Sequence, residues 1–364
     1  MNFNPSLPYN DLPHLPFQSD IDTVRILKKL ASAHRFLGEL KGEAKTIPDE
    51  NILINTLVLQ EAKDSSAIEN IITTHDELYK SGVIDNSFVD PAAKEVQRYA
   101  AALKKGLMLV AKDKLLTMNN IIEIQQEIEM NSAGFRRLPG TTLKNLKNEE
   151  VIYTPPAGYD NIMRLMENLV RYINDHELHN ADPLIKMALI HYQFESIHPF
   201  YDGNGRTGRI INVLYLILND LLDLPVLYMS RYIIKNKSRY YELLKEVKKI
   251  ESYEEWILFI LESVESTAKE TVISIRKIKR LFESISEKIE AELPNIYSRE
   301  LVNNLFYHPY TKIEFLCRDL NITRITAQKY LSMLVDAGIL TRNKLGRSYY
   351  FVNKELFGLF AGME

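Results

Sequence analysis

The chain has 364 residues, of which 46% are hydrophobic and 26% charged, and its formal net charge is −3. This composition indicates a globular protein of two or three domains, and the small net charge excludes a strong excess of acidic or basic residues over the chain as a whole. With neither an export signal nor a run of eighteen apolar residues, and with Cys317 as the single cysteine, we expect a cytoplasmic protein that has no disulfide and no membrane contact.

The N-terminal segment is predicted to be an extended arm followed by helices. Four prolines within residues 1–17 favour the extended arm. From Asp20 on, apolar residues recur at spacings of three and four, which predicts a helix with one buried face: Val24, Leu27, Leu30 and Ala31. The sequence Ile47-Pro48-Asp49 ends this helix, and residues 51–82 are expected to form one or two more.

The second of these regions contains polar residues next to an apolar stripe. Ile68, Ile71 and Ile72 have helical spacing, which predicts that they form the buried stripe. Ser65 and Glu69 are four residues apart and therefore lie on one face of a helix. Taken alone, Glu69 has the pattern of a solvated glutamate on an amphipathic helix.

Further helices are expected at 94–105, 115–130, 161–176 and 184–194, the last of them after the capping pair Asp182-Pro183. Residues 134–156 lose helical spacing, and strand character at 150–154 predicts a hairpin there. His176, His179 and His191 match no established zinc spacing, so we do not predict a metal site from them.

The stretch from His198 to Arg209 reads HPFYDGNGRTGR and has the composition of a polyphosphate site. Its glycines allow backbone amides to approach oxygens, and a helix predicted to begin near Asn204 directs its positive end to the same place. Arg206 and Arg209 share a face of that helix and are suited to hold phosphate. Asp202 is a hard-oxygen ligand for Mg²⁺, and His198 is a base that titrates near neutral pH.

The same stretch also satisfies the dinucleotide fingerprint G-x-G-x-x-G at Gly203, Gly205 and Gly208. That motif requires a preceding apolar strand, whereas the residues before it have helical spacing. A dinucleotide-binding fold is therefore disfavoured.

The C-terminal third is predicted to contain helices followed by a small wing. Residues 230–250 are expected to form one helix, Trp256 to lie in the core, and 262–292 to form a connecting helix. Three short helices at 301–306, 312–320 and 323–337, followed by a hairpin at 339–352, resemble a winged helix-turn-helix. Seven basic residues stand against three acidic ones between Tyr310 and Tyr350, a modest excess for DNA binding.

At every specified position, the stretch 198–209 resembles the signature of the Fic family, H-P-F-x-(D/E)-G-N-G-R-x-x-R. The resemblance implies a mostly α fold, with a Fic-type helical bundle and a β-hairpin flap, and an enzyme that transfers AMP from ATP to a hydroxyl side chain (Tyr, Thr or Ser) of a target protein. It implies that His198 is the general base, that Asp202 binds Mg²⁺, and that Tyr240 lies beside the adenine. The ATP-binding residues it implies are Gly203, Asn204, Gly205, Arg206, Thr207, Gly208 and Arg209, with Glu69 reaching the same site.

The Fic resemblance changes the interpretation of the upstream glutamate. Ser65, Glu69 and Asn70 match the family's inhibitory motif, (S/T)-x-x-x-E-(G/N). The match implies that Glu69 pairs with Arg209 and occupies the place where that arginine should meet the γ-phosphate. The resemblance also implies that the hairpin near 136–156 is the flap that grips the target protein.

Together these patterns predict four segments: an arm and inhibitory helices (1–100), the Fic core (101–268), a connecting helix (269–294) and the winged helix (295–364). A homodimer is plausible, and whether the winged helix binds DNA is left open. Two alternatives remain: a Fic enzyme with another activity, such as UMP transfer or AMP removal, and a nucleotide-sensing DNA-binding regulator.

Overall fold

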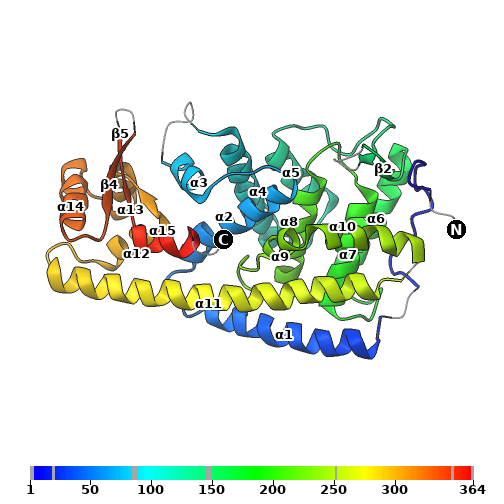
Figure 1. Ribbon diagram of the computed structural model, residues 1–364, viewed down its shortest axis with the longest axis horizontal. Coiled ribbons are helices and arrows are strands. Elements are labelled where there is room, and N and C mark those ends of the chain that lie inside the picture. The colour runs from blue at the N-terminus through cyan, green and yellow to red at the C-terminus, as the bar shows by residue number, and fades with distance from the viewer. Residues whose placement is uncertain are drawn as a thin grey trace.

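The computed structural model describes residues 4–18, 21–83, 89–144, 149–250, 252–345 and 348–361. Within these ranges the chain is mostly helical, with two small antiparallel sheets (Figure 1). The helices are α1 (Val24–Ala44), α2 (Glu50–Ile68), α3 (His75–Ser81), α4 (Pro91–Asp113), α5 (Met118–Glu129), α6 (Tyr159–Asn174), α7 (Pro183–Ile197), α8 (Asn204–Leu218), α9 (Met229–Lys235), α10 (Lys237–Ile250), α11 (Glu254–Glu292), α12 (Arg299–Tyr307), α13 (Ile313–Leu320), α14 (Arg324–Asp336) and α15 (Lys354–Ala361). The strands are β1 (Leu143–Lys144), β2 (Val151–Tyr153), β3 (Tyr310–Thr311), β4 (Thr341–Leu345) and β5 (Ser348–Val352). None of the described helices is both long and apolar enough to cross a membrane.

The centre of the core is the helical pair α7 and α8. Asp182 caps α7 by accepting a hydrogen bond from the Leu184 amide, and Pro183 occupies its first turn, as the sequence predicts. Nearly every residue of α7 is buried, because α6, α8 and α11 all pack against it. Helices α2, α4 and α5 pack against α8, so the connection between α7 and α8 is held from several sides.

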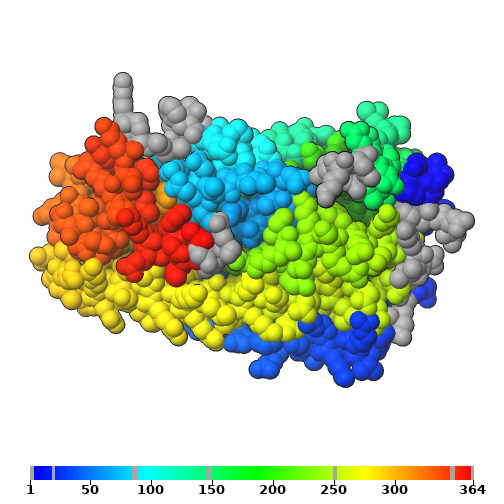
Figure 2. All heavy atoms as spheres, in the orientation of Figure 1, coloured from blue at the N-terminus to red at the C-terminus, as the bar shows by residue number. Residues whose placement is uncertain are grey.

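Helix α11 is a single helix of 39 residues that runs the length of the molecule, with α1 beside it (Figures 1 and 2). It starts before Trp256, whose indole Nε1 donates to the Ala188 carbonyl at 2.7 Å, and it crosses the predicted boundary between core and connecting helix at 268–269. Ion pairs from Lys29 to Glu265 (2.7 Å) and from Arg276 to Glu39 (3.0 Å) join α1 to the part of α11 that lies beside it.

Three local predictions need correction. The predicted buried face of α1 is wrong: Val24 and Leu27 are 67% and 46% exposed, because another apolar face of the helix packs against α11. That buried face consists of Ile26, Ala33, Leu37, Leu40 and Ala44. The stripe through Ile71 and Ile72 is also wrong, because α2 ends at Ile68 and Ile72 is 75% exposed. The single helix predicted at 230–250 is two helices that meet at Asn236.

The C-terminal domain has the predicted three helices and hairpin, to which β3 and α15 add a third strand and a closing helix. The strand order is β3-β5-β4, and Gly338 ends α14 with a positive φ of 72°. Tyr310 donates from its hydroxyl to Asp76 at 2.6 Å, and the Tyr307 hydroxyl hydrogen-bonds Asp49, so this domain packs directly on the region of α2 and α3. Two positions of the predicted hairpin, Gly346 and the basic residue Arg347, lie outside the described residues.

Candidate active site

The predicted polyphosphate loop connects α7 to α8. His198 ends α7 in the left-handed conformation (φ 50°), and Gly203 precedes α8 with a φ of 77°. The Asn204 side chain closes the loop, because its Oδ1 accepts from the Phe200 amide (2.8 Å) and its Nδ2 donates to the Phe200 carbonyl (2.9 Å). Phe200 is fully buried and anchors the loop in the core. The first amides of α8 therefore face outward from a rigid turn.

The structure separates the signature residues by what their side chains do. Asn204 and Thr207 are buried, so their side chains serve the turn and the core. A side chain at Gly208 would place its Cβ 2.7 Å from Glu195 Oε1, which explains glycine at that position. What these three residues can offer an anion is backbone and shape, whereas the two arginines and Asp202 supply charge.

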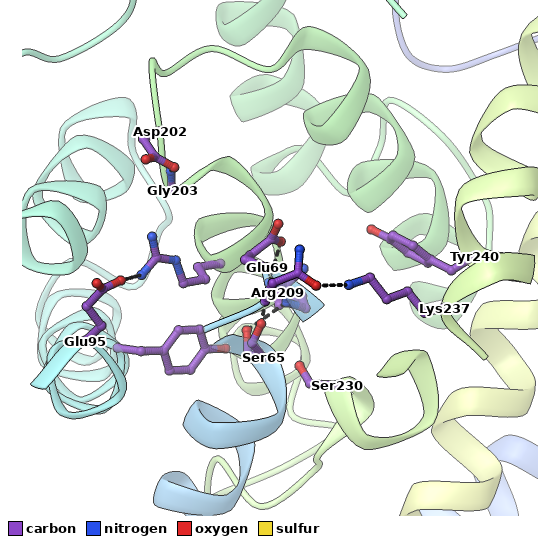
Figure 3. A network of polar contacts seen from close by, with 12 residues as sticks. Ser65, Glu69, Glu95, Asp202, Gly203, Arg209, Ser230, Lys237 and Tyr240 are labelled. Atoms are coloured by element: carbon purple, nitrogen blue, oxygen red, sulfur yellow. Dashed lines mark hydrogen bonds and ion pairs between the residues drawn. The ribbon is translucent and has the colours of Figure 1, made fainter. Parts of the chain in front are cut away.

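Arg209 is held by the end of α2, as the sequence analysis expected. Its Nε donates to Ser65 Oγ at 2.7 Å, and its Nη2 lies 3.0 Å from both the Ser65 carbonyl oxygen and Glu69 Oε1 (Figure 3). Arg209 is 2% exposed, whereas 35% of the Glu69 side chain is exposed. Asn70 continues the turn with a φ of 63° and accepts a hydrogen bond from Lys237 Nζ at 3.0 Å.

The Glu69 carboxylate lies directly over the N-terminal turn of α8. No room exists for a side-chain carbon at Gly205, because Glu69 Oε1 fills that space. An anion that approached the first amides of α8 would therefore meet a carboxylate of the same sign.

Arg206 has acidic partners of its own, which differ from those of Arg209. Its Nη2 lies 2.6 Å from Glu129 Oε1 on α5, and its Nη1 lies 3.5 Å from Glu95 Oε2 on α4. Burial raises the pKa of Glu129, and the charge of Arg206 opposes that shift. The two arginines lie three residues apart on α8, yet each is held by carboxylates of different helices.

His198 is half-buried and can act as a base at neutral pH. Burial, and then the nearby charge of Arg136, lower the pKa of the imidazole to about 4, while Glu69 and Asp202 oppose this. The imidazole is therefore neutral at pH 7, the form that accepts a proton.

Asp202 is exposed beside His198 at the start of the helix. Its Oδ1 accepts from the Gly203 amide at 2.7 Å, and its backbone carbonyl accepts from Gln125 Nε2 at 3.1 Å. The described residues contain no group of three or more His, Cys, Asp or Glu side chains that could hold a metal. One carboxylate fits Mg²⁺ when phosphates and water supply the other ligands, which is the usual magnesium arrangement at nucleotides.

Comparison with known protein families agrees with the Fic resemblance along most of the chain. Residues 27–108 match the Fic/DOC family N-terminal model, residues 115–216 match the Fic/DOC family model, and residues 281–356 match the C-terminal domain of SoFic-like protein adenylyltransferases. The chain belongs to the Fic/DOC family.

Solved Fic structures share the fold at low sequence identity. A Fic family protein from Desulfovibrio desulfuricans G20 has a TM-score of 0.57 at 19% identity, over 91% of this chain and 96% of that one. A fragment of Fic-1 from Caenorhabditis elegans has a TM-score of 0.52 at 19% identity, over 69% of this chain and 72% of the fragment.

Curated relatives match over a shorter segment. Protein adenylyltransferase Fic of Drosophila erecta is 34% identical over 93 residues, which are 25% of this chain and 17% of the relative. Protein adenylyltransferase fic-1 of Caenorhabditis elegans is 32% identical over 79 residues, which are 21% of this chain and 16% of the relative. The chain thus spans about a sixth of the length of these curated relatives.

Within the Fic site, the structure corrects the choice between two neighbouring tyrosines. Tyr240 is 1% exposed and its hydroxyl lies 2.9 Å from His191 Nε2, so it belongs to the core and has no free ring face for adenine. Tyr241 is 43% exposed, with its ring centroid 5.2 Å from that of Tyr240. Tyr241 is therefore the aromatic ring that a base could reach.

A β-hairpin forms where the sequence predicts the flap. Strands β1 and β2 pair antiparallel, with Leu143 opposite Tyr153, while residues 145–148 of the predicted flap lie outside the described residues. Sequence reasoning missed Glu129, which pairs with Arg206, and Arg136, which contacts the backbone of His198. No local motif surrounds either residue, so only the fold identifies them.

Proposed function

We propose that this Fic protein is an adenylyltransferase that transfers AMP from ATP to a hydroxyl side chain of a target protein, and that Glu69 inhibits it through Arg209. The observation that carries the proposal is the geometry of the loop, in which His198 ends α7 and Asp202 stands directly before Gly203, the residue that precedes the first turn of α8. Support comes also from the adenylyltransferase relatives whose segments match.

In the proposed reaction the target hydroxyl oxygen attacks the α-phosphorus of ATP. The bond from that phosphorus to the bridging oxygen breaks, and pyrophosphate leaves with the electron pair. His198 accepts the hydroxyl proton, a contribution of about 10²–10⁴-fold for general base catalysis. The amides of α8 and the guanidinium of Arg209 stabilise the charge on the phosphates.

Asp202 would hold Mg²⁺, which supplies charge neutralisation at the phosphates when bound. The carboxylate of Asp202 is exposed next to the first turn of α8, where a nucleotide phosphate would lie. An Asp202→Asn variant should bind ATP with little dependence on magnesium concentration.

Inhibition follows from the position of Glu69. Arg209 makes its charge-assisted contact with Glu69 and is unavailable to a γ-phosphate while that contact lasts. The carboxylate over Gly205 also repels an incoming phosphate. ATP could then bind only in a pose that does not present the α-phosphorus to the target hydroxyl.

The test compares the Glu69→Gly protein with the double variant that carries Glu69→Gly and His198→Ala. Transfer of labelled AMP should fall by at least about 10²-fold in the His198→Ala protein, whereas the dissociation constant for ATP should stay within about threefold. Undiminished labelling would remove His198 from the reaction. The same comparison with labelled UTP, and with a pre-labelled protein as substrate, separates AMP transfer from UMP transfer and from AMP removal.

A nucleotide-sensing DNA-binding regulator is the second candidate, and the winged helix favours it. Part of the basic excess is already neutralised, because Arg318 pairs with Asp319 (2.6 Å) and Arg324 pairs with Glu314 (2.7 Å). A gel-shift assay at a fixed salt concentration tests this candidate: specific DNA binding should survive excess competitor DNA, whereas non-specific binding should not.

A further inference from the structure

Four consecutive backbone carbonyls at the end of α7 receive hydrogen bonds from the flap. The Tyr153 hydroxyl donates to the Ser196 carbonyl at 2.6 Å. Arg136 provides the other three: its Nη2 donates to Ile197 (3.1 Å), its Nε to His198 (2.8 Å) and its backbone amide to Pro199 (2.9 Å). The last carbonyls of a helix have no partner within the helix, so the flap supplies what α7 lacks.

The contact is reciprocal on the other side of His198. The Tyr201 hydroxyl accepts hydrogen bonds from the amides of Arg137 (2.9 Å) and Leu138 (3.1 Å) at the base of the flap. The base of the flap and the signature loop are thus joined both before and after the imidazole. A displacement of one segment would disturb the other.

Burial of the Arg136 guanidinium carries a desolvation penalty that packing alone does not explain. It is 2% exposed, and within the described ranges no carboxylate lies within ion-pair distance of its guanidinium. Its partners are carbonyl oxygens, and burial lowers its pKa. A buried cation at the C-terminal end of a helix is compensated by the helix dipole, which places the charge next to His198.

His198 needs such support because its backbone is in the left-handed region, with a φ of 50°. A residue with a side chain keeps that conformation only where its surroundings hold it. The backbone conformation in turn sets the direction in which the imidazole leaves the chain. A guanidinium that grips the carbonyl of His198 and of its predecessor fixes both peptide planes.

We propose that Arg136 and Tyr153 are positioning residues that hold the backbone of His198 so that the imidazole faces the target hydroxyl. The proposal rests on the proposed function, in which His198 is the general base. The flap that would take up the target strand is then physically joined to the base that serves this target. The charged groups around the imidazole are Arg136 from the flap, Glu69 from the end of α2, and Asp202 from the loop.

The test uses the full chain in a Glu69→Gly background, with four further substitutions. Arg136→Gln removes the charge and most of the grip, Arg136→Lys keeps the charge but loses the planar fork, and Tyr153→Phe removes one hydroxyl while keeping the ring. Arg171→Gln on α6 is the control, because Arg171 is exposed and pairs only with Asp175 among the described residues.

Two readouts distinguish positioning from a purely structural role. The first is the split between kcat and the KM for ATP: kcat should fall about 10–100-fold in Arg136→Gln while the KM for ATP stays within about threefold. Tyr153→Phe should lower kcat by about fivefold, the value of one hydrogen bond, and Arg136→Lys should recover part of the loss. The control should match the parent.

The second readout is independent of activity. The imidazole of His198 is followed by nuclear magnetic resonance, assigned by its disappearance in His198→Gln, as the pH is varied. In Arg136→Gln the imidazole should titrate at higher pH, since a neighbouring positive charge is gone. If a thermal melt shows that Arg136→Gln does not fold, the kcat values of Arg136→Lys and Tyr153→Phe test the proposal instead.

Each outcome has one meaning. Unchanged kcat in the folded variants would overturn the proposal, whether or not the titration shifts. A loss confined to the KM for the target would also overturn it, because the flap would then only grip. If the Glu69→Gly parent itself transfers no AMP, the proposed function fails, and an imidazole that titrates alike in the parent and in Arg136→Gln would then overturn the role of Arg136 separately.

Discussion

Replacing Glu69 by glutamine tests the inhibitory contact with the smallest change in shape. Arg209 Nη2 lies 3.0 Å from Glu69 Oε1, and the contact is charge-assisted. Hydrogen bonds to charged groups contribute about 1.5–3 kcal/mol when buried. Because 35% of the Glu69 side chain is exposed, we expect about 1–2 kcal/mol, a shift of about 5–30-fold between blocked and open forms.

The assay measures the initial rate of auto-modification with ATP labelled at the α-phosphate. Glu69→Gln should raise the rate by that factor, and Glu69→Gly should raise it further, because glycine also removes the side-chain atoms over Gly205. Arg209 keeps its contacts with Ser65 in both variants, so the loop should stay folded. Glu50→Gln, at the exposed other end of α2, is the matched control and should leave the rate unchanged.

Equal rates for wild type, Glu69→Gln and Glu69→Gly would refute this reasoning. If His198→Ala still abolished labelling in that case, the catalytic assignment would stand and only the inhibitory role of Glu69 would be lost. High salt offers a second check, because it weakens a partly exposed ion pair and should raise the wild-type rate more than that of Glu69→Gln.

Three further predictions follow from buried contacts. Tyr241→Ala should weaken ATP binding by about 5–100-fold, the range for loss of one stacked base. Tyr240→Phe should mainly lower the melting temperature, because the contact of its hydroxyl with His191 is lost. Equilibrium ATP binding and thermal melts of both variants separate these effects. Burial raises the pKa of Glu61 to about 8, so the folded state keeps a proton that the unfolded state releases above the ordinary pKa of the group. Wild type should therefore lose stability relative to Glu61→Gln as the pH rises from about 5 to about 8. A constant difference in unfolding free energy between the two proteins over this pH range would count against the buried acid. Tyr310→Phe should cost about 1 kcal/mol of unfolding free energy by removing the hydrogen bond to Asp76, and an unchanged denaturation midpoint would show that this contact does not hold the C-terminal domain in place.

The sequence was sufficient where the chemistry is local. Residues 198–209 form one turn and the start of one helix, so the relative placement of Asp202, Gly203 and Arg209 follows from spacing alone. The motif also led to the contact between Glu69 and Arg209, although these residues are 140 positions apart. The family resemblance, and not periodicity, supplied that link.

Sequence reasoning failed where the rotation of a helix or a distant partner decides. Tyr240 and Tyr241 are adjacent, and only the packing of Trp256 and His191 determines which ring is buried. The contact between Arg136 and His198 spans 62 positions, and that between Glu129 and Arg206 spans 77, with no motif around either partner. On α1, two apolar stripes have helical spacing, and only the packing against α11 shows which one is buried.

The most direct test of AMP transfer supplies the Glu69→Gly protein with ATP labelled either at the α-phosphate or at the γ-phosphate, and follows which label becomes bound to protein. If AMP is transferred, the α-label and the adenine become protein-bound, pyrophosphate appears in equal amount, and the γ-label does not become bound. Protein-bound γ-label, or labelled protein that forms equally well in His198→Ala, would contradict the proposed reaction.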